Sequence, residues 1–127
     1  ISFDLLEYMH RCKTGAMIKA SVMLSAVLCG ASSQDEKRLE EFSEKIGLAF
    51  QIKDDILDVE GDFKNLGKAI GSDVTNDKTT FVTTFGIEKS KEILADIISQ
   101  AVDIMKPFGN NAGFLVSLAH YIAARGN

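Results

Sequence analysis

The chain has 127 residues, of which 46% are hydrophobic and 25% are charged, so its composition is that of a folded globular domain rather than of a disordered chain. Its 14 basic and 18 acidic side chains give a net charge of −4, which argues against nonspecific binding to nucleic acid. An anionic ligand would therefore need local lysines or metal ions to hold it.

A first helix is predicted over residues 4–28. Its second half is almost entirely small or apolar, so we expect this half to be covered on most sides. The apolar run over residues 16–31 is interrupted by Lys19 and falls short of the roughly 20 residues that span a bilayer, which predicts a buried helix and no membrane span. Gly15 and Ala16 would let another backbone or a ligand approach closely.

The two cysteines, Cys12 and Cys29, do not have the spacing of metal ligands. On one helix they would lie about 25 Å apart, which is too far for a disulfide. We therefore expect reduced thiols, as in a cytoplasmic protein.

A second, long helix is predicted to begin at Ser33, which forms a capping-box pattern with Glu36. It is predicted to end near Gly61. Its inward-facing residues are predicted to be Leu39, Phe42, Ile46, Ala49 and Phe50.

The last part of this helix is strongly acidic. Residues 53–62 contain Asp54, Asp55, Asp58, Glu60 and Asp62. One apolar stripe is predicted to run through Ile52, Ile56, Val59 and Phe63. On another face lie Asp54 and Asp58, one turn apart, with Asp55 and Asp62 at its border.

Two carboxylates in a partly buried site repel each other by on the order of 3–4 kcal/mol, so something should offset this repulsion. A Mg²⁺ ion would do so, because it takes one or two carboxylates and fills its other positions with water and phosphate oxygens. The alternative is a solvated acidic surface, which is the more frequent explanation for an arbitrary run of acids.

Residues 62–77 are predicted to form a long loop, a feature that is often functional, placed to fold over the acidic face. A short helix capped by Asp77 or Thr75 should then run through Thr84, with Gly86 as its break. Two further helices are predicted over residues 88–106, stopped by Pro107, and over residues 111–124. No alternating run predicts a strand, so the fold class is predicted to be all-α.

Four short motifs follow one another along the chain. They are Lys13-Thr14-Gly15-Ala16, Phe50-Gln51-x-x-Asp54-Asp55-x-x-Asp58, Leu66-Gly67-Lys68 with Gly71-Ser72-Asp73, and Lys78-Thr79-Thr80. Their order and spacing resemble the C-terminal half of a trans-isoprenyl diphosphate synthase, or polyprenyl synthetase, over nearly all of the chain. Among these enzymes the resemblance is to the bacterial farnesyl and geranylgeranyl diphosphate synthases.

The resemblance implies an all-α bundle around a deep central cavity, of which residues 1–127 would be the C-terminal half of one domain. The first aspartate-rich motif of the family would precede residue 1. At the mouth of the cavity, Mg²⁺ would join the aspartates to an allylic diphosphate. Asp54 would be the principal metal ligand, and Asp55 and Asp58 would complete or support the metal site.

The resemblance also implies roles for the other motif residues. Lys13 and Lys68 would contact the allylic diphosphate, and Thr14 and Gln51 would line the cavity near the reacting carbon. Phe50 would belong to the substrate-binding set, and Lys78 would help to close the mouth. Without the joint register of these motifs, each residue has a plainer interpretation, such as a solvated or snorkelling lysine.

The activity implied is the condensation of an allylic diphosphate with isopentenyl diphosphate, with farnesyl diphosphate favoured as product and the C20 product next. A homodimer is implied as well, and the chain alone is expected not to catalyse the condensation. Two alternatives stay open. The first is a noncatalytic partner subunit of the same fold, which the intact aspartate motif argues against. The second is a terpene cyclase, which the Lys-Thr-Gly and Gly-Lys motifs argue against.

Overall fold

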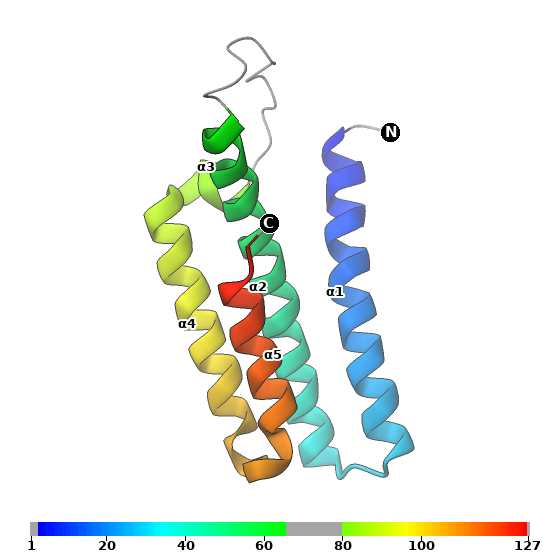
Figure 1. Ribbon diagram of the computed structural model, residues 1–127. Helices are drawn as coiled ribbons and strands as arrows, with labels where there is room; N and C mark the ends of the chain where they lie inside the picture. The colour runs from blue at the N-terminus through cyan, green and yellow to red at the C-terminus, as the bar shows by residue number, and fades with distance from the viewer. Residues whose placement is uncertain (1–2, 66–79, 127) are drawn as a thin grey trace.

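The computed structural model describes residues 3–65 and 80–126 (Figure 1), and within these ranges every regular element is a helix. The elements are α1 (Phe3–Leu28), α2 (Ser33–Asn65), α3 (Phe81–Phe85), α4 (Ile87–Met105), the 3₁₀ helix η1 (Lys106–Ala112) and α5 (Gly113–Ala124). The all-α prediction is therefore confirmed. No helix in the described ranges is long and apolar enough to cross a membrane.

Helix α2 is the centre of the arrangement, because it contacts α1, α3, α4 and α5. Figure 1 shows α1 running antiparallel to α2 on one side, with α4 and α5 on the other side. Within the part of the chain that the structure describes, α1 packs against α2 alone. One side of α2 is thus packed against α4 and α5, whereas the other side is packed against α1 alone.

The core lies between α2, α4 and α5, and it explains why these segments form amphipathic helices. The buried residues of the core are Phe42, Ile46, Ala49, Ile52, Ile56, Leu94, Ile97, Ile98, Ala101, Met105, Ala112, Ala119 and Ile122. Burying one such large aliphatic side chain stabilises the fold by about 1.5–3 kcal/mol relative to leaving it exposed. Of the residues of α2 predicted to face inward, Leu39 and Phe50 are only half-buried, and the others are buried.

The prediction that the second half of α1 is covered on most sides is wrong. Met17, Leu24 and Leu28 are 62%, 64% and 85% exposed, and Ala26 is the one buried side chain among residues 12–28. The reason is that α1 contacts a single helix, α2, within the described ranges, so only one of its faces is covered, and even Ile18, Val22 and Met23 are only half-buried. A segment that is apolar all round has no periodicity that would show which face is buried.

Helix α2 begins at Ser33 as predicted, but its cap and its C-terminal end differ from the prediction. The helix is capped by Ser32 rather than Ser33, because Ser32 Oγ accepts a hydrogen bond of 3.1 Å from the Asp35 N–H. At the other end the helix continues through Gly61 to Asn65. Glycine inside a helix costs only about 1 kcal/mol, so Gly61 is a weak stop signal.

The extension of α2 changes two further predictions. Residues 62–65, which were predicted to begin the loop, are helical, and the rest of that loop, 66–77, lies outside the described residues. Phe63 is 69% exposed, so the buried stripe of α2 does not reach it.

The short helix α3 is capped by Thr80, not by Asp77 or Thr75. The Thr83 N–H donates to Thr80 Oγ1 at 3.1 Å, and the Thr80 N–H donates to Thr83 Oγ1 at 2.8 Å. Gly86 ends α3 as predicted, with φ 82° and ψ 162°.

The last two helices lie close to their predicted places. Helix α4 begins and ends one residue before its predicted bounds, and Pro107 follows it in η1. Helix α5 begins at Gly113, two residues later than predicted, after a kink at Gly109.

Candidate functional site

The candidate site lies along the contact between α1 and α2. At Gly15 and Gly47 the two helices approach so closely that a Cβ atom added to Gly47 would lie 3.2 Å from Gly15 Cα. The close backbone approach predicted at Gly15 is therefore confirmed. It brings the Lys13-Thr14-Gly15-Ala16 motif against the turns of α2 that precede the acidic stretch.

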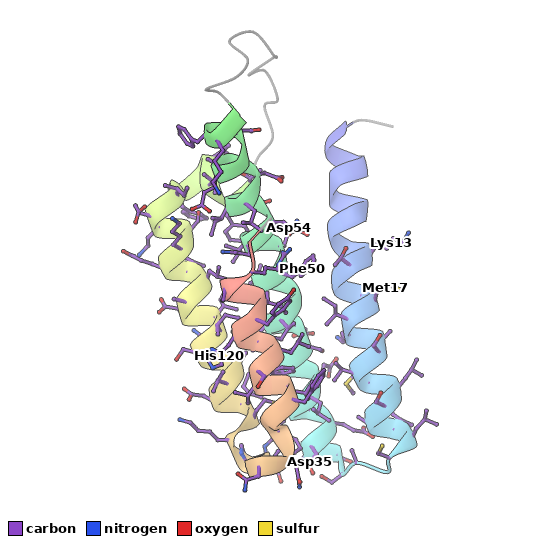
Figure 2. The ribbon with its side chains drawn as sticks, viewed as in Figure 1. Lys13, Met17, Asp35, Phe50, Asp54 and His120 are labelled. Atoms are coloured by element: carbon purple, nitrogen blue, oxygen red, sulfur yellow. The ribbon has the colours of Figure 1, made fainter. Side chains whose placement is uncertain are left out.

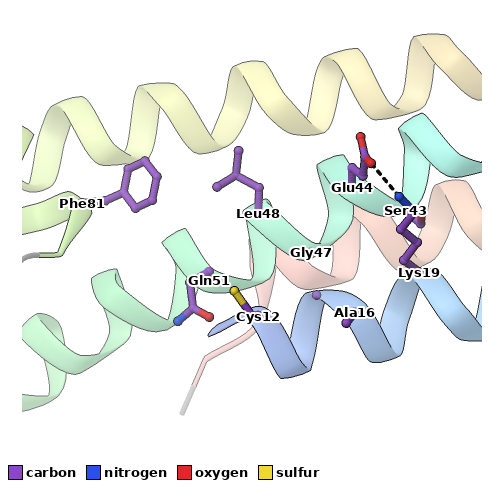
Figure 3. A pocket seen from close by; sticks show the side chains of 10 residues that line it. Cys12, Ala16, Lys19, Ser43, Glu44, Gly47, Leu48, Gln51 and Phe81 are labelled. Atoms are coloured by element: carbon purple, nitrogen blue, oxygen red, sulfur yellow. Dashed lines mark hydrogen bonds and ion pairs between the residues drawn. The ribbon is translucent and has the colours of Figure 1, made fainter. Parts of the chain in front are cut away.

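A pocket of about 380 Å³ lies beside this contact (Figure 3). Its lining residues are Cys12, Gly15, Ala16, Lys19, Ser43, Glu44, Gly47, Leu48, Gln51 and Phe81. The volume is within the range of small-molecule sites, about 300–1,000 Å³. Cys12 and Gln51 stand at one end of the pocket, and the ion pair of Lys19 and Glu44 stands at the other.

The ion pair fixes one end of this pocket. The Lys19 ammonium lies 2.7 Å from Glu40 Oε1 and 2.9 Å from Glu44 Oε1, and it thereby ties α1 to α2. The hydrogen bonds to Glu40 and Glu44 raise the pKa of Lys19 above its ordinary value. Lys19 therefore carries its charge at neutral pH, and that charge is already paired with the carboxylates of Glu40 and Glu44.

The residues of the Lys-Thr-Gly-Ala motif are not all directed to this pocket. Gly15 and Ala16 line it, whereas Lys13 and Thr14 do not. Lys13 is exposed and points away from α2 (Figure 2), and Thr14 is half-buried. Lys68 and Lys78, the other two lysines predicted to contact or enclose the diphosphate, lie outside the described residues.

The three aspartates of the acidic motif have different surroundings. Asp54 is half-buried, with 39% of its side chain exposed, and Asp58, one turn later, is exposed. Asp55 is only 5% exposed, and its Oδ2 accepts a hydrogen bond of 3.1 Å from the Phe81 N–H at the start of α3. Part of the Asp54 side chain and the Asp58 side chain are thus exposed, while Asp55 anchors α3.

An arginine that the sequence reasoning missed contacts this motif. Arg125 follows α5, and its Nη2 forms an ion pair with the Asp54 carboxylate and donates to the Phe50 carbonyl oxygen at 3.2 Å. Its guanidinium carbon lies 4.2 Å from the centroid of the Phe50 ring. The sequence signal was only an arginine after an apolar helix, and its partner is 71 residues away.

The donor set fits a magnesium ion that is shared with a phosphate group. Asp54 and Asp58 offer hard oxygen ligands, and Mg²⁺ commonly binds one or two carboxylates together with substrate phosphates. In the described ranges no group of three or more His, Cys, Asp and Glu side chains could hold an ion without other ligands. These residues therefore suit an ion that joins protein to substrate better than a closed structural site.

Comparison with known proteins shows which family the chain belongs to. A model of the polyprenyl synthetase family matches residues 1–107. The chain is 39% identical to the farnesyl diphosphate synthase of Micrococcus luteus, over 98% of this chain and 43% of that protein. It is 41% identical to a chloroplastic geranylgeranyl pyrophosphate synthase of Capsicum annuum, over 100% of this chain and 35% of that protein.

A solved structure shows the same fold. The apo crystal structure of an FPP/GFPP synthase from Zymomonas mobilis superposes with a TM-score of 0.74 and 31% sequence identity, covering 96% of this chain and 39% of that one. The chain thus spans about two fifths of the length of the relatives it matches. With the family model matching most of its length, the chain belongs to the polyprenyl synthetase family.

Proposed function

We propose that this chain is part of a short-chain trans-prenyltransferase that condenses an allylic diphosphate with isopentenyl diphosphate. The observation that carries the proposal is the placing of Asp54 and Asp58. These carboxylates lie one turn apart on α2, in a member of the polyprenyl synthetase family, and Gln51 links the same helix to a largely apolar pocket. Residues 1–127 would form the C-terminal part of one synthase domain.

In this proposal Asp54 and Asp58 hold Mg²⁺, and Asp55 supports the site by fixing the start of α3. When bound, Mg²⁺ would supply positive charge for the oxygens of the departing pyrophosphate. Lys13 and Lys68 would contact the same diphosphate, and Lys78 would help to close the site. Such charges lower the barrier because they act where negative charge develops as the carbon–oxygen bond breaks.

The allylic cation left by this bond cleavage needs polar groups that do not capture it. The hydroxyl of Thr14 and the amide oxygen of Gln51 can stabilise it by their dipoles, and Phe50 would contribute to the same substrate-binding surface. Apolar walls protect the cation from water until the double bond of isopentenyl diphosphate attacks it and a proton is lost. Most of the lining of the pocket next to Gln51 is of this kind.

Substitution of the two aspartates tests the proposal. In the complete protein, Asp54→Asn and Asp58→Asn should each lower the rate of isopentenyl diphosphate consumption by about 100-fold or more, because a charge-stabilising group is lost. Asp103→Asn is the matched control, since Asp103 is an exposed residue that pairs with Lys106 at 2.6 Å. Wild-type rates in both motif variants would refute the proposal.

We further propose farnesyl diphosphate as the product, with geranylgeranyl diphosphate as the nearest alternative, and a homodimer as the assembly. Relatives of both product classes match the chain at similar identity. Chromatography of the dephosphorylated products gives the chain length, and light scattering gives the mass of the assembly. A hydrocarbon product would instead indicate a cyclase, and a complete protein without turnover would indicate a noncatalytic partner subunit.

A further inference from the structure

Arg125 joins two residues of the proposed substrate and metal site. Its Nη2 pairs with Asp54 Oδ1 and also donates to the carbonyl oxygen of Phe50, while its guanidinium covers the Phe50 ring at 4.2 Å. Only 19% of the Arg125 side chain is exposed. The Arg125 side chain is therefore packed against Asp54 and Phe50 rather than extended into solvent.

Two features of Arg125 suggest that its ion pair with Asp54 can be broken. Its Nε is buried and has no hydrogen-bond partner among the described residues, so this position does not satisfy the whole guanidinium. Arg125 also lies just past α5, with φ −57° and ψ 144°, which is an extended conformation. The side chain could therefore move away from Asp54 without unwinding the helix.

A bound divalent cation and the guanidinium would make conflicting demands on Asp54. Both are positive and both need its carboxylate oxygens, and at this separation in a partly buried site like charges repel strongly.

We propose that Arg125 and a divalent cation compete for the Asp54 carboxylate, so that the arginine holds the aspartate in the metal-free protein and releases it when the metal site fills. This inference rests on the proposed function, because it takes Asp54 to be a metal ligand. Arg125 would then be a positioning residue that sets the metal affinity of the site. Its role would be to keep the acidic face neutralised in the absence of metal and diphosphate.

The test is metal binding by the complete protein, measured with Mn²⁺ as the probe by electron paramagnetic resonance of the free ion, in the presence of inorganic pyrophosphate. Arg125→Gln should bind Mn²⁺ about tenfold more tightly than the wild type, because a competing positive charge is removed. Arg38→Gln is the matched control. Arg38 lies away from the site and forms a similar ion pair, with an N–O distance of 3.0 Å to Asp35. This variant should leave the affinity unchanged.

Asp54→Asn separates this inference from the proposed function. If Asp54→Asn does not weaken Mn²⁺ binding, the proposed metal site is wrong. If it does weaken binding but Arg125→Gln binds Mn²⁺ as tightly as the wild type, or less tightly, the competition is refuted and Arg125 only supports the fold. A purely structural arginine would lower the thermal stability of the variant without raising its metal affinity.

A second measurement uses the wild-type protein and does not depend on the folding of a variant. Trypsin cleaves after arginine, and the pairing with Asp54 should protect the bond between Arg125 and Gly126 in the metal-free protein. Mn²⁺ with pyrophosphate should accelerate this cleavage relative to cleavage after the exposed Lys89, with both products followed by mass spectrometry. An unchanged or slower relative rate would contradict the release of Arg125.

Discussion

Asp54, Asp55 and Asp58 stand within little more than one turn of α2, and each meets a different environment. Asp54 pairs with Arg125, Asp55 is buried and accepts the Phe81 N–H, and Asp58 is exposed. Helical spacing was enough to predict that Asp54 and Asp58 share a face. It could not predict the partners of Asp54 and Asp55, because both come from segments that are brought to α2 by tertiary packing.

Loss of the Asp55 carboxylate should destabilise the protein. A hydrogen bond to a charged group contributes about 1.5–3 kcal/mol, so Asp55→Ala should lower the free energy of unfolding by about that amount. Asp55→Asn should cost less, since its amide oxygen can still accept from the Phe81 N–H. Urea unfolding measures both, with Asp62→Ala as the control at an exposed position of the same helix. Equal stability of the Asp55→Ala and Asp62→Ala variants would show that the hydrogen bond contributes nothing.

At the level of whole elements, the positions of the helices were predictable and their exposure was not. Glycine, proline and the helical spacing of apolar residues located the five α-helices of the described ranges to within a few residues, but not the 3₁₀ helix η1. The cover of α1 could not be predicted, because a run such as residues 16–31 is apolar on every face. Neither could the cap of α2, because Ser32 and Ser33 are both good N-cap residues and only one of them can take the position.

At the contact between α1 and α2, alanine substitution of Gly47 and of Gly15 should change stability by different amounts. A Cβ at Gly47 would meet Gly15 Cα at 3.2 Å, whereas a Cβ at Gly15 would meet nothing within 4 Å. Both changes to alanine gain helix propensity, about 1 kcal/mol, but only Gly47→Ala must push the helices apart. We therefore expect Gly47→Ala to be less stable than Gly15→Ala by about 1–2 kcal/mol in denaturant unfolding. Equal stability would mean that α1 can shift freely.

The ion pair between α2 and α4 should make stability depend on pH. Lys91 Nζ lies 2.8 Å from Glu60 Oε1, and this hydrogen bond lowers the pKa of Glu60 from its ordinary value of 4.5 and raises the pKa of Lys91. A lowered carboxyl pKa stabilises the folded state above the unfolded pKa, and that stabilisation is lost as the pH falls through the folded pKa.

Glu60→Gln should therefore lower the melting temperature slightly at pH 7, and the difference from the wild type should vanish once the pH is well below the lowered pKa of Glu60. Lys91 is exposed and Glu60 is half-buried, so solvent screening keeps the effect small. Glu41→Gln, at an exposed position of α2, is the control for the loss of a surface carboxylate. A constant difference between Glu60→Gln and wild type down to low pH would exclude the ion pair as its cause.

For the molecule as a whole, α2 has unequal cover on its two sides. Helices α4 and α5 enclose the core on one side, whereas α1 alone lies on the other and exposes Met17, Leu24 and Leu28. The all-α class followed from the absence of alternating runs, and a bundle of helices was implied by the resemblance to the synthases. Periodicity alone could not have given the arrangement of the helices, since it does not say which helices are neighbours.

The 127-residue chain, produced on its own, should not catalyse the condensation at a useful rate. The acidic motif supplies Asp54 and Asp58, and the chain spans about two fifths of the length of the relatives it matches, so it would supply only part of a metal–diphosphate site. Incubation with Mg²⁺ and both diphosphate substrates, followed by product analysis, tests this expectation. The complete protein serves as the positive control, and clear turnover by the chain alone would contradict it.

The hydrogen bond between Asp55 and Phe81 also bears on amide hydrogen exchange. The first N–H groups of a helix lack an acceptor within the helix, so in a five-residue helix such as α3 they would ordinarily exchange with solvent almost freely. The Phe81 N–H instead points to a carboxylate that is 5% exposed on the central helix. Its exchange must therefore await a local opening that parts α3 from α2, and its protection measures the free energy of that opening rather than the stability of α3 itself.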